Sequence, residues 1–109
     1  MSNAAPTISI PQMPNLKAII ISASWHPEIC DALVAGAKRG FAVAGINNPT
    51  VRTVAGSFEL PLAAQLAFEQ GFDIAVVVGL VLRGETPHFD YVCQGVTNGV
   101  MQVSLNKSK

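Results

Sequence analysis

Two short, uninterrupted apolar runs constrain the fold of this chain more than any other feature of its sequence. Residues 18–21 and 74–78 lack the polar–apolar alternation of a half-exposed strand, so each is typical of a strand buried on both faces. The β-branched segment 50–54 predicts a third strand. Apolar residues at helical spacing predict helices at residues 27–44, 56–71 and 86–105. Strands and helices in this alternation predict a three-layer αβα domain with a parallel sheet.

Each predicted helix is expected to bury one face and to begin at a recognisable residue. The expected inward positions are Ile29, Leu33, Gly36 or Ala37, and Phe41 in the first helix, and Leu62, Ala63, Leu66 and Ala67 in the second. Thr86 and Pro87 have the residue types of an N-cap and of the first helical position, so the third helix is expected to start there.

The composition narrows the classes of partner. Half of the 109 residues are hydrophobic, only 13% are charged, and the formal net charge is zero. Such a chain has no basic field for a nucleic-acid backbone or an anionic membrane. No apolar stretch approaches the roughly 20 residues of a membrane-spanning helix, and no secretory signal pattern opens the chain. With so little charge, we expect some apolar surface to be covered by other subunits.

The N-terminal residues and the two cysteines lead to further expectations. Residues 1–16 contain three prolines and little periodicity, which predicts an extended arm before a single α/β domain at 17–109. Such an arm is suited to pair with the sheet edge of another subunit. Cys30 and Cys93 fall in helical patterns without metal-ligand spacing, so both are expected as small core residues in a reducing cytoplasm.

The candidate binding residues follow the three predicted strands. Ligands of an open parallel sheet bind beyond the carboxyl ends of its strands, and Trp25 lies there with an aromatic face suited to a flat heterocycle. After the second strand, Ser57 and Glu59 offer a hydroxyl and a carboxylate. By residue type alone, a structural role of Trp25 at the rim or in the core is as common as a stacking role. Ser57 is more often a helix N-cap than a binding residue.

Residues 83–88 form the most informative segment. Here Gly84 and the start of the third helix favour an anion such as a phosphate, with Thr86 adding a hydroxyl. His88, in the first turn, is a candidate for proton transfer, although a surface or structural histidine is as common. His26, beside Pro27 at another helix start, is interpreted as a cap or packing residue.

Other familiar site motifs are missing from the sequence. It contains no glycine-rich dinucleotide fingerprint, nucleophile elbow or metal-ligand cluster. A generic flavodoxin-like nucleotide binder would need a phosphate loop after the first strand, and Ser22–Trp25 has no glycine there. The residues themselves therefore predict a site for a planar, phosphate-bearing or two-part substrate.

Three segments at the strand ends carry a specific resemblance. The sequences Ser24-Trp25-His26, GSFELP at 56–61 and GLVLRGETPHFDY at 79–91 resemble lumazine synthase, the penultimate enzyme of riboflavin biosynthesis. The likeness runs in order from about Lys17 to Leu105. It implies a flavodoxin-like sheet and assembly as a pentamer or an icosahedral shell. It also implies condensation of 5-amino-6-(D-ribitylamino)uracil with 3,4-dihydroxy-2-butanone 4-phosphate, without a metal or an organic cofactor.

The resemblance also implies a role for each matching residue. His88 would donate and accept protons. The implied binding residues are Trp25 for the pyrimidine ring, Ser57, Phe58 and Glu59 for the ribityl chain, Leu80, Val81 and Leu82 for the uracil edge, and Glu85 and Thr86 for the phosphate turn.

One departure from the family pattern leaves a second hypothesis open. Family members continue beyond a residue like Leu105 with a fourth strand and further helices, which supply an aromatic group and a basic group at a site shared between subunits. This sequence ends at Lys109, so we expect a sheet without its fourth strand. The alternative to an active lumazine synthase is a catalytically silent subunit that binds a pteridine or flavin, or that serves assembly.

Overall fold

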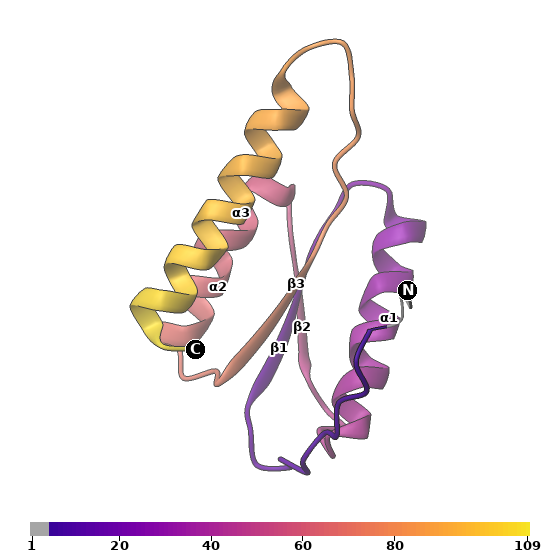
Figure 1. The fold of residues 1–109 in the computed structure, drawn as a ribbon, viewed down its shortest axis with the longest axis vertical. Helices are drawn as coiled ribbons and strands as arrows, with labels where there is room; N and C mark the ends of the chain where they lie inside the picture. Colours follow the sequence, from indigo (N-terminus) through magenta and orange to yellow (C-terminus); the bar gives the residue numbers. More distant parts are fainter. Residues whose placement is uncertain (1–4) are drawn as a thin grey trace.

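The fold is a three-stranded parallel sheet with helices on both faces, as Figure 1 shows for the computed structural model, which describes residues 5–109. The strands are β1 (Ala18–Ala23), β2 (Thr50–Val54) and β3 (Ile74–Val78). The helices are α1 (Pro27–Val43), the 3₁₀ turn η1 (Ser57–Glu59), α2 (Leu60–Glu69) and α3 (His88–Lys107). The strand order β2-β1-β3 is the order in which flavodoxin-like sheets begin. The predicted α/β class and parallel sheet are therefore confirmed.

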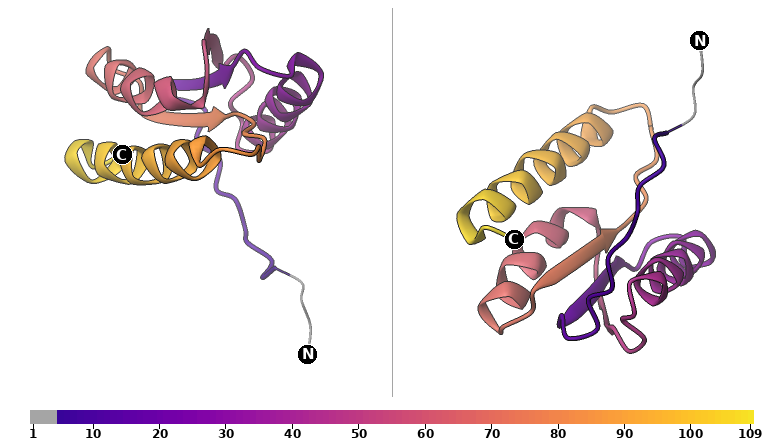
Figure 2. Two further views of the ribbon diagram at one scale, coloured as in Figure 1. Left: turned by 90° about the horizontal axis from the view of Figure 1, so that it is seen from above. Right: turned by 60° about the horizontal axis from the view of Figure 1, so that its bottom comes forward.

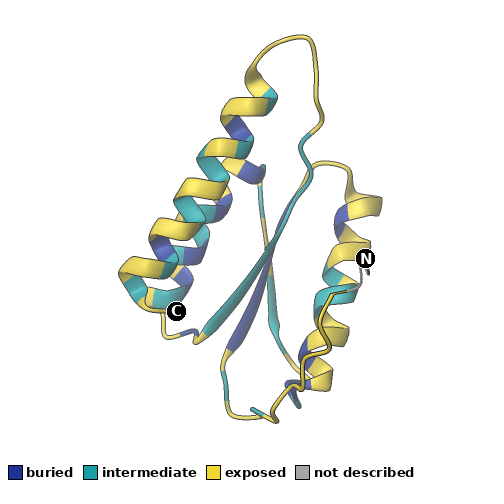
Figure 3. Ribbon diagram, viewed as in Figure 1, coloured by how far each residue is buried: buried dark blue, intermediate teal, exposed yellow. Residues whose placement is uncertain are grey.

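The central strand β1 joins the three layers. It pairs with both neighbours, so that Ile20 lies opposite Val51 and Val76. Successive side chains of a strand point to opposite faces. Ile20 packs in the cluster on the α1 side, whereas Ile19 and Ile21 pack in the cluster built with α2 and α3. Figure 3 shows β1 buried along its length, as its uninterrupted apolar sequence predicts.

Strand β3 has a different environment from β1. It pairs only with β1, and within residues 5–109 its outer edge has no strand beside it. All five of its residues are half-buried. From the end of β3 the chain runs to α3, which packs mainly against α2 and η1.

The inward faces of α1 and α2 differ from the expected ones. Ile29 and Leu33 are 48% and 42% exposed, while Cys30 is buried one position further along. Leu62 and Leu66 are also largely exposed. The core-facing positions also include Ala37 and Phe41 of α1 and Ala63 and Ala67 of α2, as expected, together with Val34 of α1 and Leu60, Ala64 and Phe68 of α2. Both helices carry apolar residues on adjoining faces, so spacing alone did not identify the buried one.

The start of α3 also differs from the expectation. The backbone N–H of Tyr91 donates to the carbonyl of Pro87 at 3.1 Å, which makes Pro87 the N-cap and His88 the first helical residue. The prediction placed Thr86 at the N-cap and Pro87 one position inside the helix. Thr86 instead lies one residue before the cap, and its Oγ1 accepts a bond of 3.4 Å from the His88 N–H.

The cysteines fall into two environments. Cys30 is fully buried, as expected, and its Sγ–H donates to the carbonyl of Trp25 at 3.2 Å. Cys93 is only partly buried and belongs to neither core cluster, so the expectation of a core residue is wrong there.

The segment before β1 extends away from the domain in Figure 2. Residues 5–16 contain no helix or strand, and Ile8 is 76% exposed. The segment is held at its end, where Met13 N–H donates to the Ala44 carbonyl at 2.8 Å. Residues 1–4 lie outside the described part, and pairing of this arm with another subunit stays a prediction. Across residues 5–109, no helix combines the length and apolarity needed to cross a bilayer.

Close packing of α3 on α2 depends on a glycine. A Cβ at Gly99 would lie 2.8 Å from Cβ and Cγ of Pro61, whose ring is rigid. We expect Gly99→Ala to lower the free energy of unfolding by about 1 kcal/mol, because overpacking outweighs the gain in helix propensity. Denaturant unfolding measures the change. Gly40→Ala on α1, where a Cβ meets nothing within 4 Å, should raise stability instead. An increase in both variants would contradict this packing.

Candidate functional site

A cleft of about 460 Å³ opens beyond the carboxyl ends of the strands. It is lined by residues that follow β1, β2 and β3 and by residues from the start of α3. These are Trp25, His26, Ala55, Gly56, Ser57, Phe58, Glu59, Leu80, Val81, Leu82, His88 and Val92. The cleft therefore lies where ligands of open parallel sheets bind.

The wall that follows β1 presents the aromatic ring of Trp25. Trp25 is 66% exposed, while its backbone carbonyl is fixed by the bond from Cys30 Sγ. A Cβ at Gly56 would lie only 3.4 Å from Nε1 of the indole. Glycine thus lets the strand-end loop lie close beside the edge of the ring. The rest of the indole is accessible, so the ring is a rim aromatic suited to stack on a flat ligand.

The segment that follows β2 folds into a tight turn against α3. The backbone N–H of Gly56 donates to Glu59 Oε2 at 2.8 Å, which makes Gly56 the N-cap of η1. The expectation that Ser57 acts as the N-cap is therefore wrong. Ser57 is buried, and a Cβ at Gly79 would meet its Oγ. Phe58 is half exposed, with the edge of its ring close to the backbone of Gly95.

The segment that follows β3 forms the opposite wall. Leu80 and Val81 are partly buried, whereas Leu82 is 60% exposed. These residues belong to no helix or strand. Their apolar side chains line the cleft, so the walls are largely apolar with a few polar groups. Small-molecule sites have this character.

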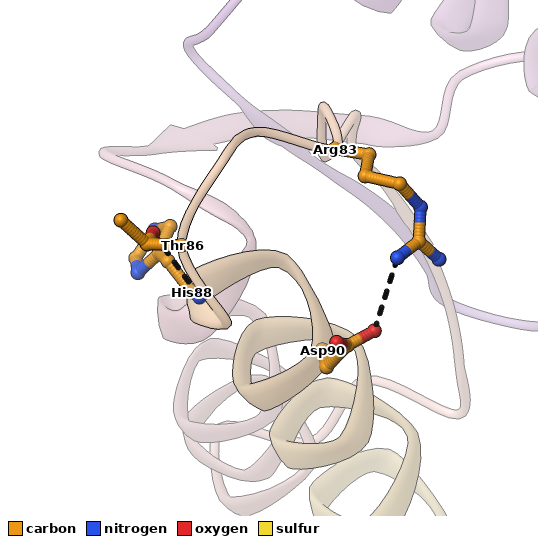
Figure 4. Close-up of polar contacts among 4 residues, drawn as sticks. All are labelled: Arg83, Thr86, His88 and Asp90. Carbon is orange, nitrogen blue, oxygen red and sulfur yellow. Dashed lines mark hydrogen bonds and ion pairs between the residues drawn. The ribbon is translucent and has the colours of Figure 1, made fainter.

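The start of α3 brings His88 to the cleft, but it leaves part of the predicted phosphate turn outside. Thr86 and Glu85 are exposed and are not among the lining residues. Figure 4 shows Arg83 and Asp90 away from the Thr86–His88 pair, joined by an ion pair of 3.6 Å between Nη1 and Oδ1. The Arg83 guanidinium also lies 4.3 Å from the centre of the Phe89 ring.

Sequence reasoning missed four residues that line the cleft, namely His26, Ala55, Gly56 and Val92, and only His26 among them has a polar side chain. His26 occupies the N-cap position of α1, but its side chain makes no capping hydrogen bond and the residue is exposed. It lines the cleft beside Trp25. The interpretation as a cap or packing residue is thus wrong for the imidazole. Its adjacency to Trp25 was the signal that could have found it.

The arrangement is suited to holding a planar molecule and moving protons. Two aromatic rings, two imidazoles, one hydroxyl and one carboxylate line the cleft among apolar groups. Within residues 5–109, no group of three or more His, Cys, Asp or Glu side chains is placed to hold a metal ion. The chemistry available to these side chains is hydrogen bonding and proton transfer.

Comparison with known proteins identifies the family. The model of the 6,7-dimethyl-8-ribityllumazine synthase family matches residues 15–109, a range that includes every residue of the cleft. The chain belongs to this family. The lumazine synthase of Streptomyces coelicolor is 48% identical over 101 residues, which are 93% of this chain and 63% of that protein. The lumazine synthase of Mycolicibacterium paratuberculosis is 45% identical over 109 aligned residues, covering 95% of this chain and 68% of the relative.

The chain aligns with only part of the length of its relatives. This chain spans 63% of the length of both the S. coelicolor and the Streptomyces avermitilis lumazine synthases, the second of which is 47% identical over 102 residues. The aligned part includes the sheet, the cleft and α3. Family membership and fold are thus established for this chain, and the roles of its residues follow as proposals.

Proposed function

We propose that the cleft is a lumazine synthase site. It binds 5-amino-6-(D-ribitylamino)uracil and 3,4-dihydroxy-2-butanone 4-phosphate and condenses them to 6,7-dimethyl-8-ribityllumazine, with release of phosphate and water. The observation that carries this proposal is that Trp25 and His88, which follow different strands, line one cleft. This condensation needs an aromatic side chain that holds the pyrimidine and a side chain that transfers protons.

In the proposed complex, the pyrimidine stacks on Trp25. The exposed face of the indole supports this role. Ser57, Phe58 and Glu59 line the ribityl chain, and Glu59 keeps Oε1 for a hydroxyl because Oε2 accepts the Gly56 N–H. The backbone of Leu80, Val81 and Leu82 follows the edge of the uracil.

The phosphate is proposed to bind at the start of α3. The first N–H groups of a helix lack intrahelical partners and favour anions. Glu85 and Thr86 lie on the exposed turn that leads into this helix, and a Cβ at Gly84 would meet nothing within 4 Å. The turn is therefore open to a phosphate, which places the butanone phosphate next to His88.

His88 is proposed as the catalytic residue. The amine of the pyrimidine attacks the ketone carbon, and loss of water gives an imine. Elimination of phosphate then gives an enol, which tautomerises to a new ketone at the neighbouring carbon. The second amine attacks this ketone to close the ring, and a second water leaves. Each step moves a proton, and an imidazole accepts and returns it. Because the amine is already a nucleophile, holding the two substrates together supplies much of the remaining acceleration.

Self-association is proposed as well. Ile29, Leu33, Leu62 and Leu66 are exposed apolar residues on the outer helices, a feature that favours burial against other subunits. A pentamer or an icosahedral shell and a cytoplasmic location remain predictions from the resemblance and the composition. The alternative function, a catalytically silent subunit that binds a pteridine or flavin or that serves assembly, stays a second hypothesis.

Product formation separates the two functions. The chain is incubated with both substrates, and lumazine fluorescence is followed against a blank without protein. A rate above the blank that depends on protein concentration supports the enzyme. Binding of the pyrimidine without product above the blank would support the silent binding subunit. Absence of both binding and product would reject the enzyme and the binding subunit and leave only a role in assembly.

Trp25 gives the binding step its own test. Stacking of a base on an aromatic side chain contributes about 1–3 kcal/mol, so Trp25→Ala should weaken binding of the product about tenfold. Trp25→Phe keeps an aromatic face, so its affinity for the product should fall less than that of Trp25→Ala. Isothermal titration calorimetry with 6,7-dimethyl-8-ribityllumazine measures both. Equal affinities for the wild type and Trp25→Ala would show that the ring binds elsewhere.

A further inference from the structure

We propose that His26 is a further ligand-binding residue of the cleft, whose imidazole hydrogen-bonds the hydroxylated side chain of the ring that stacks on Trp25. The residue would select ligands that carry a polyol over the same heterocycle without one. This inference rests on the proposed function, since it assumes that the ring lies on Trp25.

The position of His26 supports this role. It lines the cleft, directly follows Trp25 and belongs to the same wall. The start of α3, where the phosphate is proposed to bind, belongs to the wall formed after β3. A ring stacked on Trp25 therefore lies beside His26, and a ribityl chain that runs from this ring toward Ser57 and Glu59 is proposed to pass His26. The imidazole is exposed and makes no capping hydrogen bond, and no partner for either of its nitrogens is found within residues 5–109.

The backbone holds His26 in an unusual conformation. Its φ of 51° and ψ of 66° lie in the left-handed region, which disfavours residues other than glycine. The turn itself is fixed without the imidazole, because the N–H groups of Ile29 and Cys30 donate to the His26 carbonyl at 3.1 Å. The side chain is thus not needed to form the turn. Strained backbone of this kind is concentrated at functional sites.

The polar side chains after β2 provide few hydrogen-bonding groups for a ribityl chain. A ribityl chain has several hydroxyl groups, each able to donate and accept. Ser57 is buried against Gly79, and Oε2 of Glu59 is taken by the Gly56 N–H. On the adjoining wall after β1, the two ring nitrogens of His26 add further hydrogen-bonding groups, since a neutral imidazole has one donor and one acceptor. His26 thus supplies the two kinds of partner that hydroxyl groups require.

The test compares two ligands that differ only in the polyol. The chain is titrated calorimetrically with 6,7-dimethyl-8-ribityllumazine and with 6,7,8-trimethyllumazine, in which a methyl group replaces the ribityl chain. His26→Gly removes the imidazole and suits the left-handed backbone, so its thermal midpoint should not fall below that of the wild type. Glu28→Ala, an exposed neighbour outside the cleft, is the control.

The outcomes separate His26 from the site as a whole. We expect His26→Gly to lower the affinity for the ribityl ligand about tenfold, as for the loss of one or two hydrogen bonds. The affinity for the methyl ligand should not change. His26→Asn, which tolerates this backbone and keeps a shorter amide, should lie in between. An equal loss for both ligands, or no loss for either, would overturn the role of His26. Failure of the wild type to bind either ligand would instead reject the proposed function.

Discussion

His88→Ala should lower the initial rate of lumazine formation by about 100-fold, the smaller end of the usual effect of a general acid–base group. The loss of rate is at the smaller end because the substrate amine needs no activation and water can replace the imidazole as a slower proton donor and acceptor. His88 is exposed at the first position of α3 and lines the cleft beside Val92. Removing its ring therefore leaves the fold unchanged. The pyrimidine should still bind within about twofold of the wild-type affinity, since Trp25 and the η1 wall are intact.

Two measurements define this prediction. Initial rates at saturating substrate give the catalytic step, and calorimetric titration with the pyrimidine gives binding. Gln94→Ala, an exposed α3 residue outside the cleft, should keep both values. A His88→Ala variant with the wild-type rate would remove His88 from the chemistry. A loss of rate matched by an equal loss of pyrimidine affinity would make it a binding residue only.

Gly79→Val should lower the free energy of unfolding by about 3 kcal/mol, at the upper end of overpacking effects. Gly79 directly follows β3, and a Cβ there would lie 2.5 Å from Ser57 Oγ and within 3.4 Å of Leu60 and Ala23. Ser57 and Leu60 are buried, so neither can move aside freely. The added methyl groups would force β3 and η1 apart. These two elements carry opposite walls of the cleft.

Denaturant unfolding measures the loss of stability. Gly84 lies on the same loop, and a Cβ there would meet nothing within 4 Å. The free energy of unfolding of Gly84→Ala should therefore stay within about 0.5 kcal/mol of the wild-type value. Product binding by Gly79→Val, measured well below its midpoint, should also weaken. Wild-type stability in Gly79→Val would mean that β3 and η1 are not packed as closely as described.

The elements of the fold could be predicted because the two apolar runs leave few alternatives. Residues 18–21 and 74–78 are too short for buried helices of ordinary length and too apolar for an exposed strand, so a parallel sheet between helices followed. The buried faces of the helices could not be predicted with the same accuracy. Ile29 and Leu33 have helical spacing, yet the residues of α1 that pack against the sheet are Val34, Ala37 and Phe41, because the packing of α1 on the strands, and not its sequence alone, sets the rotation of the helix.

The candidate site was predictable to the extent that it depends on topology. The strand ends meet at one edge, which brought Trp25, the 56–59 segment and His88 into one cleft. The left-handed turn at His26 depends on the junction of β1 with α1 and leaves no pattern in the sequence. Without that turn in view, a histidine before Pro27 is typical of a helix start.

The shared cleft of Trp25 and His88 is tested most directly by NMR. The chain is labelled with ¹⁵N and titrated with 6,7-dimethyl-8-ribityllumazine, and the indole Nε1–H of Trp25, its only tryptophan, is followed together with the imidazole of His88. We predict that both signals shift along curves with one dissociation constant. A shift of only one signal, or two different dissociation constants, would contradict a single site that holds the ring on Trp25 within reach of His88.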